Sequence, residues 1–100
     1  MSKRLKIKWS ELALEDLEAI REYVSNDKPV AAERLAARLR RSVLRLVEQP
    51  QSGRPVPEFP GTALREVIVP PYRIVYEAEA ERIVIYRVWH GRRALWEMTR

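Results

Sequence analysis

The stretch LREVIVPPYRIVYEAEAERIVIYRVWH, residues 64–90, contains three runs of β-branched and aromatic residues with short breaks between them. Pro70 and Pro71 end the first run, and the polar residues 77–79 separate the second run from the third. Such runs are typical of strands. Links this short join antiparallel neighbours, because a parallel pair needs a crossover of a dozen residues or more. The stretch therefore predicts antiparallel strands at residues 64–69, 72–78 and 82–89.

The residues before this stretch predict one more strand and two helices. Apolar and basic residues alternate over residues 5–9, as in a half-buried strand. Ser10 stands at a helix N-cap position, and the helix that follows should end near Ser25. Pro29 suits the first turn of a second helix, which should run to about Gln49 because Pro50 cannot continue it. Apolar side chains at helical spacing predict the buried faces of the two helices: Ala13, Leu17, Ile20 and Val24 in the first, and Ala32, Leu35, Leu39, Val43 and Leu46 in the second.

These elements predict an α+β fold. Their order is β-α-α-β-β-β, and the turn between the helices is so short that the two must lie side by side. We expect this N-terminal helical hairpin to pack on one face of an antiparallel sheet and to leave the other face at least partly open. Residues 50–61 contain four prolines and two glycines, which is typical of a stiff connecting loop. A chain of 100 residues has room for one such domain, residues 1–100.

Composition excludes several kinds of site. The chain has no cysteine and one histidine, which excludes disulfides, thiolate chemistry and a histidine-rich zinc site, and we expect neither a metal nor a cofactor. The N-terminus lacks an apolar signal-peptide core, and no run reaches the roughly 18 apolar residues of a membrane span. We therefore expect a cytoplasmic protein with no membrane partner. A net charge of +5 favours anionic partners, either nucleic acid or an acidic protein segment.

Four arginines recur at helical spacing on one side of the second predicted helix, away from its apolar stripe. They form an arginine ridge, which is either a solvated helix face or a binding surface. Its members are Arg34, Arg38, Arg41 and Arg45.

Two more arginines, Arg73 and Arg87, stand in the middle of predicted strands. Strand alternation places Arg73 on the face opposite Ile74, and places Arg87 on the same face as Trp89. If the two arginines share one face, the sheet carries a positive patch. The other face of the last strand is apolar enough to be core, and its predicted members are Val84, Tyr86, Val88 and His90.

Five segments follow one another through the chain: WSELALEDLEAIREYV, PVAAERLAARL, LVEQPQSGRP, LREVIVPPYRIVY and VIYRVWHGRR. In this order and spacing they resemble the RelE/ParE superfamily of bacterial type II toxins over nearly the whole chain. The resemblance implies a cytosolic toxin held inactive in a hetero-oligomer with a cognate antitoxin, whose flexible, acidic C-terminal segment wraps around it. For that segment we expect contacts with the arginine ridge and with the apolar residues of the chain end, Leu95, Trp96 and Met98.

The opening helix, the Ala-Ala pair of the second helix and the V-x-H-G-x-R ending resemble ParE most. A ParE-like toxin is associated with inhibition of DNA gyrase and lacks a recognised nuclease set, and its antitoxin is of the ParD type. In this interpretation the residues that contact the target are Arg65, Arg73, Arg87, His90, Arg92 and Arg93.

Two alternatives stay open. A RelE-like toxin cuts messenger RNA in the ribosomal A site without a metal, and such chemistry needs a base, an acid and cations around the phosphate. Glu58, Arg73 and His90 approximate the set used by some RNA-cutting relatives, although LREVIV lacks the lysines of RelE itself. His90 also has an alternative, purely structural interpretation, in which it forms a hydrogen bond with nearby backbone at the end of a strand. A third hypothesis is a basic interaction module with no toxic action.

Overall fold

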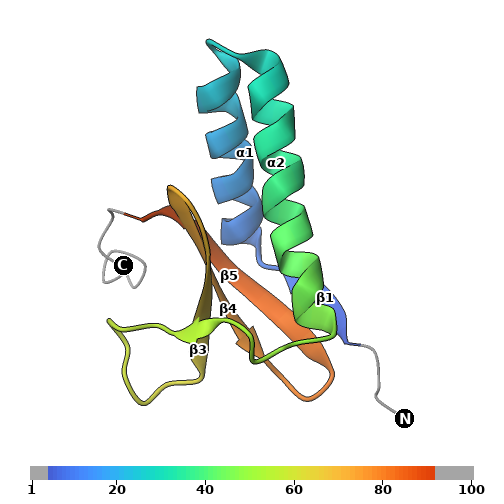
Figure 1. The fold of residues 1–100 in the computed structure, drawn as a ribbon, viewed down its shortest axis with the longest axis vertical. Coiled ribbons are helices and arrows are strands. Elements are labelled where there is room, and N and C mark those ends of the chain that lie inside the picture. The colour runs from blue at the N-terminus through green and yellow to red at the C-terminus, as the bar shows by residue number, and fades with distance from the viewer. Residues whose placement is uncertain (1–4, 92–100) are drawn as a thin grey trace.

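The computed structural model describes residues 5–91, in which two antiparallel helices stand on one side of a twisted five-stranded sheet (Figure 1). The elements are β1 (Lys6–Trp9), α1 (Glu11–Ser25), α2 (Pro29–Leu44), the short 3-10 helix η1 (Arg45–Val47), β2 (Arg54–Pro55), β3 (Leu64–Val69), β4 (Tyr72–Ala78) and β5 (Arg82–His90). The predicted α+β class, the helical hairpin and the three consecutive C-terminal strands are confirmed.

The sheet is mixed rather than wholly antiparallel. Its strand order is β1-β5-β4-β3-β2, and β3, β4 and β5 form the predicted antiparallel meander. β1 pairs with β5 in parallel, with Ile7 opposite Ile83. The intervening helices and strands are long enough for a parallel connection, and no local turn signal reports how two such distant strands pair. The two-residue β2 was not predicted, and it lies in the proline-rich loop, where it pairs with β3.

The ends of the helices follow the sequence closely. The Ser10 hydroxyl accepts a hydrogen bond from the Ala13 N–H at 3.0 Å, which confirms the predicted N-cap, and it donates one to the Tyr86 carbonyl at 2.9 Å. One side chain thus starts α1 and attaches it to β5. α2 begins at Pro29 as predicted, but its regular part ends at Leu44, and a single 3-10 turn completes it.

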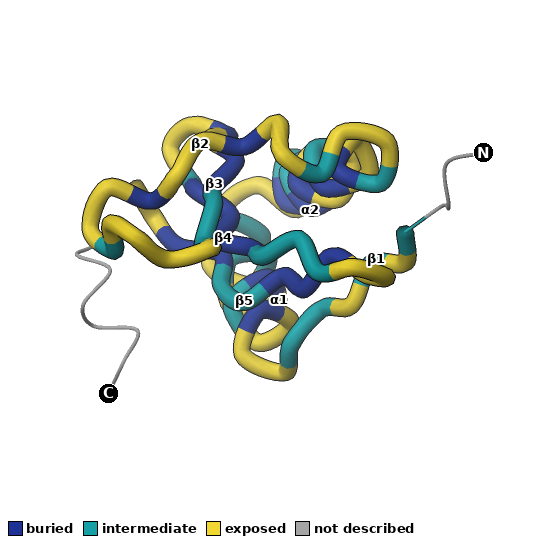
Figure 2. The backbone as a smooth tube through the Cα atoms, turned by 90° about the horizontal axis from the view of Figure 1, so that it is seen from below, coloured by how far each residue is buried: buried dark blue, intermediate teal, exposed yellow. Residues whose placement is uncertain are grey.

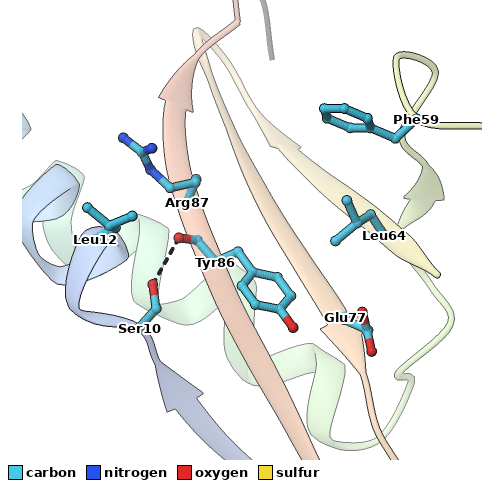
Figure 3. Close-up of a pocket in the computed structure, with 7 residues that line it drawn as sticks. All are labelled: Ser10, Leu12, Phe59, Leu64, Glu77, Tyr86 and Arg87. Atoms are coloured by element: carbon cyan, nitrogen blue, oxygen red, sulfur yellow. Dashed lines mark hydrogen bonds between the residues drawn. The ribbon is translucent and has the colours of Figure 1, made fainter. Parts of the chain in front are cut away.

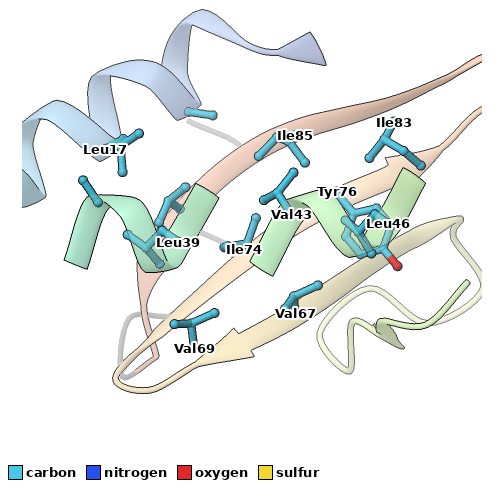
Figure 4. Close-up of a cluster of buried hydrophobic side chains, with 13 residues drawn as sticks. Leu17, Leu39, Val43, Leu46, Val67, Val69, Ile74, Tyr76, Ile83 and Ile85 are labelled. Atoms are coloured by element: carbon cyan, nitrogen blue, oxygen red, sulfur yellow. The ribbon is translucent and has the colours of Figure 1, made fainter. Parts of the chain in front are cut away.

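The main core lies between the helical hairpin and the sheet (Figure 4). Seen from below, buried stretches of β3, β4 and β5 occupy the middle of the molecule, and exposed loops surround them (Figure 2). Ala36 joins this core although the sequence did not single it out. Its fully buried or nearly buried members are Ala13, Leu17, Ala36, Leu39, Val43, Leu46, Val67, Val69, Ile74, Tyr76, Ile83, Ile85 and Val88.

The predicted core face of β5 was wrong over half of the strand. Tyr76 pairs with Ile85 but Val75 pairs with Arg87, so Tyr86 is an extra residue opposite β4. Such a bulge reverses the alternation of side chains along the strand. Ile83 and Ile85 therefore face the helices before the bulge, and Val88 faces them after it.

Candidate functional site

The face of the sheet away from the helices carries Arg73, Val75, Arg87 and Trp89, because Arg73 pairs with Trp89 and Val75 with Arg87. We call this the open face. The two mid-strand arginines thus share a face, as the positive-patch prediction required. They are not free cations, however, since each is matched by carboxylates from other elements.

Arg73 is buried on this face, with 7% of its surface exposed. Its Nη1 and Nη2 donate to the two carboxylate oxygens of Glu58 at 3.3 and 2.7 Å, and Nη1 also donates to Oε1 of Glu66 at 3.2 Å. The other oxygen of Glu66 accepts from Nε of Arg54 at 2.6 Å. A chain of alternating charges, Arg54–Glu66–Arg73–Glu58, therefore crosses from β2 through β3 and β4 to the proline-rich loop. Neutralisation of this kind is what permits a buried guanidinium.

The ion pairs of this network shift the pKa values of Arg73 and Glu58. Burial lowers the pKa of Arg73, but its hydrogen bonds and ion pairs with Glu58 and Glu66 outweigh burial and raise that pKa overall. The hydrogen bonds from Arg73 hold the pKa of Glu58 below its usual range. Both groups are therefore charged at neutral pH.

Arg87 has a comparable partner on α1. Its Nε and Nη2 donate to the two oxygens of Asp16 at 2.8 and 3.0 Å, and its guanidinium lies 4.8 Å from the ring centre of Trp89. Hydrogen bonding to Asp16 raises the pKa of Arg87. Asp16 also accepts from the N–H of Val88 at 3.0 Å, so one carboxylate caps the edge of β5 where β1 has ended.

The sequence analysis missed Asp16. A signal for it exists, since Asp16 lies three residues after Ala13 and four before Ile20, on the edge of the stripe that packs on the core. A carboxylate at such a position has to find a partner across the helix–sheet boundary.

The proline-rich loop covers part of the open face. Val56 is buried against Val75 and Trp89, and Phe59 and Leu64 pack around this second apolar cluster. The open face is thus partly covered, in agreement with the prediction of a face that is at least partly open. The loop also brings Glu58 to Arg73, two members of the predicted ribonuclease set that are 15 residues apart in sequence.

His90, the third member of that set, projects from the other side of the sheet. It pairs with Tyr72, one residue from the Arg73–Trp89 pair, and consecutive strand residues face opposite sides. Its ring meets the edge of Tyr72 at a centroid distance of 5.8 Å, and Tyr72 packs against the core below the helices. The structure therefore brings Glu58 and Arg73 together and leaves His90 on the opposite face.

Of the remaining residues predicted to contact the target, the structure describes Arg65 only. Arg65 turns toward the loop and donates to the Gly53 carbonyl at 2.7 Å, so it supports the loop rather than facing outward as a free cation. Arg92 and Arg93 lie outside the described residues, as do Leu95, Trp96 and Met98.

The arginine ridge is exposed along α2 and η1, with all four side chains on the surface. Arg38 donates to the Pro70 carbonyl at 3.0 Å, which shows that the ridge lies on the side of α2 that faces the β3–β4 turn. Beyond its pairing with β2, the outer edge of β3 at residues 67–69 has no strand neighbour within the described part of the chain. A shallow polar hollow lies there, with Arg45 and Arg54 beside Ile68, which is 48% exposed.

A second, larger hollow of about 480 Å³ lies on the open face (Figure 3). Leu12 of α1 lines one side, and Phe59 and Leu64 line the other. Tyr86 forms its floor and Glu77 one end. We call it the open-face groove. It is mainly apolar, and no three His, Cys, Asp or Glu side chains within residues 5–91 are grouped as a metal site would require.

A family model described as the ParE toxin of type II toxin–antitoxin systems, parDE, matches residues 7–95. The chain belongs to the ParE toxin family. It is therefore a toxin of a type II toxin–antitoxin system, as the resemblance implied. Within residues 5–91 of this ParE-family toxin, no helix is both long and apolar enough to cross a membrane.

Two relatives of this chain carry the names of toxins. The chain is 41% identical over 86 residues to "Toxin RelE2" of Caulobacter vibrioides, covering 85% of this chain and 93% of that protein. It is 37% identical over 79 residues to "Putative toxin Y4kP" of Sinorhizobium fredii, covering 76% and 82%.

Two solved structures share the fold of this ParE-family toxin. The chromosomal ParDE system of P. aeruginosa superposes with a TM-score of 0.76 at 23% identity, covering 89% of this chain and 98% of that one. The RelBE2 toxin–antitoxin complex of Mycobacterium tuberculosis superposes with a TM-score of 0.64 at 20% identity, covering 87% and 98%.

Proposed function

We propose that this toxin acts as ParE-like toxins do, by inhibiting DNA gyrase, and not as a ribonuclease. The observation that carries the proposal is the separation of the predicted nuclease set, with His90 on the face opposite Glu58 and Arg73. An acid and a base must both reach the same phosphodiester, and groups on opposite faces of one sheet do not. Carboxylates already neutralise Arg73, which argues against its use as the cation of a catalytic site.

We propose fewer target contacts than the sequence predicted, because three of the six predicted residues bind groups within the protein. Arg65, Arg73 and Arg87 hold loop, sheet and helix together. His90 is exposed at the end of β5, and Arg92 and Arg93 follow it in the sequence. These last three residues remain the proposed target contacts.

The direct test compares two reactions of the purified toxin. We expect it to block gyrase-dependent supercoiling of plasmid DNA, or to trap cleaved DNA on gyrase, and to leave ribosome-bound messenger RNA intact. A matched pair of variants locates the surface: His90→Ala should weaken gyrase inhibition, and Tyr23→Ala, at the exposed tip of the hairpin, should not. Messenger RNA cleaved in the ribosomal A site, with supercoiling unaffected, would reverse the assignment.

The second candidate is a RelE-like ribonuclease. The Glu58–Arg73 pair favours it, together with the name of the relative RelE2. It requires Arg73→Ala and His90→Ala to slow cleavage strongly in proteins that remain folded. The third hypothesis, an interaction module without toxic action, requires normal growth of cells that express the chain without an antitoxin.

We further propose an antitoxin as the partner, with an acidic extended segment of the ParD type that lies along the arginine ridge. Two features support this location. The ridge presents four exposed cations on one side of α2 and η1, and the neighbouring edge of β3 has no strand partner at residues 67–69 within the described part of the chain. A segment with acidic and apolar residues would pair with the ridge and continue the sheet. The apolar chain-end residues stay a prediction as antitoxin contacts.

A further inference from the structure

The β3–β4 turn connects the arginine ridge to the end of β5. Its two residues, Pro70 and Pro71, are both exposed, and the carbonyl of each accepts a hydrogen bond from another element. Nη2 of Arg38 on α2 donates to the Pro70 carbonyl at 3.0 Å. The N–H of Gly91, directly after β5, donates to the Pro71 carbonyl at 2.6 Å. Consecutive Cα atoms lie no more than about 3.8 Å apart, so the two donors meet at one small turn.

His90 lies at this same end of the sheet. It pairs with Tyr72, the first residue of β4, and Tyr72 also pairs with Val69, the last residue of β3. Residues directly opposite each other share a face, and Tyr72 packs against the core on the face that carries the helices. His90, the turn and Arg38 are all exposed. They form one surface that runs from the ridge over the turn to His90.

We propose that the antitoxin segment bound along the ridge continues over the Pro70–Pro71 turn and covers His90, so that bound antitoxin excludes the target from His90. The inference rests on the proposed function, in which the ridge binds the antitoxin and His90 contacts the target. It adds the physical link between the two surfaces, and Arg38 is the residue at which they meet.

The geometry of the sheet sets the length of segment that this requires. A segment that continues the sheet beside residues 67–69 lies three strand spacings from β5, because β3 and β4 stand between them. Neighbouring strands are about 4.8 Å apart, so the separation is roughly 14 Å. Five extended residues reach about 16 Å, so five residues beyond the β3 edge are enough to arrive at His90.

Charge favours an acidic segment as the occupant. The hydrogen bond to Pro70 fixes the guanidinium of Arg38 beside the turn. A guanidinium has five N–H donors, so the bond through Nη2 leaves others for a carboxylate. A carboxylate that pairs with Arg38 therefore lies next to the turn and directs the segment over it. A second copy of this toxin would instead bring like charges against the ridge.

The chain has one histidine, so chemical modification of its imidazole reports directly whether this surface is covered. Diethylpyrocarbonate modifies accessible imidazoles, and peptide mapping by mass spectrometry quantifies the reaction at His90. With cognate antitoxin at about 100 times its Kd, roughly 1% of the toxin is free, so we expect His90 to react at least about tenfold more slowly. Tyr23→His places a reference imidazole at an 80% exposed position on the hairpin, where the antitoxin should not change the rate.

Two charge reversals on α2 test the role of Arg38. Arg38→Glu should restore the reaction of His90 in a complex that calorimetry shows to be saturated, because the segment is repelled at the turn. Arg40→Glu, exposed on the same helix but outside the ridge, should leave His90 protected. Circular dichroism checks the fold of each variant.

Three results would overturn the inference. One is an unprotected His90 in the saturated wild-type complex, and another is equal protection of His90 and of the imidazole introduced by Tyr23→His. The third is protection that persists in Arg38→Glu, because the antitoxin then reaches His90 by another path. None of these readouts involves gyrase, and calorimetry of ridge variants tests the antitoxin location separately. Failure of this inference is therefore distinguishable from failure of the proposed function.

Discussion

At the scale of single residues, polar groups inside the sheet hold the proline-rich loop in place. Tyr76 is fully buried on β4, yet its hydroxyl donates to the Pro50 carbonyl at 2.8 Å and accepts from the Gly53 N–H at 2.9 Å. Burial raises the pKa of this phenol. A Cβ on Gly53 would come within 2.6 Å of the Tyr76 ring, so only glycine fits so close an approach. The loop can cover the open face because its first residues are fixed in this way.

We therefore expect Tyr76→Phe to destabilise the protein by about 1–3 kcal/mol, because the Gly53 N–H and the Pro50 carbonyl lose a buried partner. Urea unfolding followed by circular dichroism measures the free energy of unfolding. Tyr23→Phe is the control, since Tyr23 is 80% exposed and should change stability by less than about 0.5 kcal/mol. Equal stabilities of the two variants would contradict a structural role for the buried hydroxyl.

The Glu58–Arg73 pair predicts a pH effect of defined sign. Folding lowers the pKa of Glu58 from its ordinary value of 4.5, so its ionised form contributes stability above that value, and the contribution is lost as pH falls through the lowered pKa. Glu58→Gln removes the ionisable carboxylate and with it this contribution to stability. We expect the variant to be less stable than the wild type at pH 7, and the difference to shrink as pH falls below about 4.5.

Thermal unfolding at several pH values between 7 and 3 measures this difference. Glu48→Gln, at an exposed position after η1, serves as the control and should follow the wild type throughout. A constant difference between Glu58→Gln and the wild type at all pH values would show that the ion pair does not titrate as inferred.

At the scale of elements, α1 is joined to β5 by more than apolar contact. Ser10 bonds the Tyr86 carbonyl, and Asp16 holds both the Arg87 guanidinium and the Val88 N–H. Both ends of the Asp16–Arg87 pair are only 16% exposed. The β5 edge that β1 leaves uncovered is therefore closed by a helix, whereas the β3 edge beyond β2 has no such cover in the part of the chain that the structure describes.

We expect Asp16→Ala to cost about 3 kcal/mol in free energy of unfolding, because it leaves Arg87 and a strand N–H without their carboxylate. Glu15→Ala removes an exposed carboxylate from the neighbouring position and should cost less than about 0.5 kcal/mol. A double-mutant cycle with Arg87→Ala isolates the pair itself. Additive losses in that cycle would mean that the two side chains are not energetically coupled.

At the scale of the whole molecule, charge is distributed unevenly. The open face is neutralised by Glu58, Glu66 and Asp16, whereas the arginine ridge is exposed on the helical side. Exposed cations are therefore present where the antitoxin is proposed to bind, and the open face offers an apolar groove instead. Binding to the ridge should depend strongly on ionic strength.

We expect Arg41→Glu with Arg45→Glu to weaken antitoxin binding by roughly tenfold or more, because like charges meet across the interface. Arg40→Glu is the matched control, since Arg40 is exposed on the same helix but is not part of the ridge. Calorimetry with the cognate antitoxin at low and high salt measures both effects. Equal losses from the two variants, or an affinity that does not change with salt, would place the antitoxin elsewhere.

The sequence alone determined the features that depend on residues close together in the chain. Ser10 and Pro29 mark helix starts because capping and a fixed φ act within a few residues, and the short breaks after residues 69 and 78 require antiparallel neighbours. Only the tertiary structure decided which groups meet across long separations: the parallel pairing of β1 with β5, the bulge at Tyr86, and the carboxylates that neutralise Arg73 and Arg87. The extra residue Tyr86 reverses the face of the sheet on which the later side chains of β5 lie. The proline-rich loop brings Glu58 to the buried Arg73. Neither event leaves a mark in the local pattern, because both depend on the packing of segments far apart in the chain.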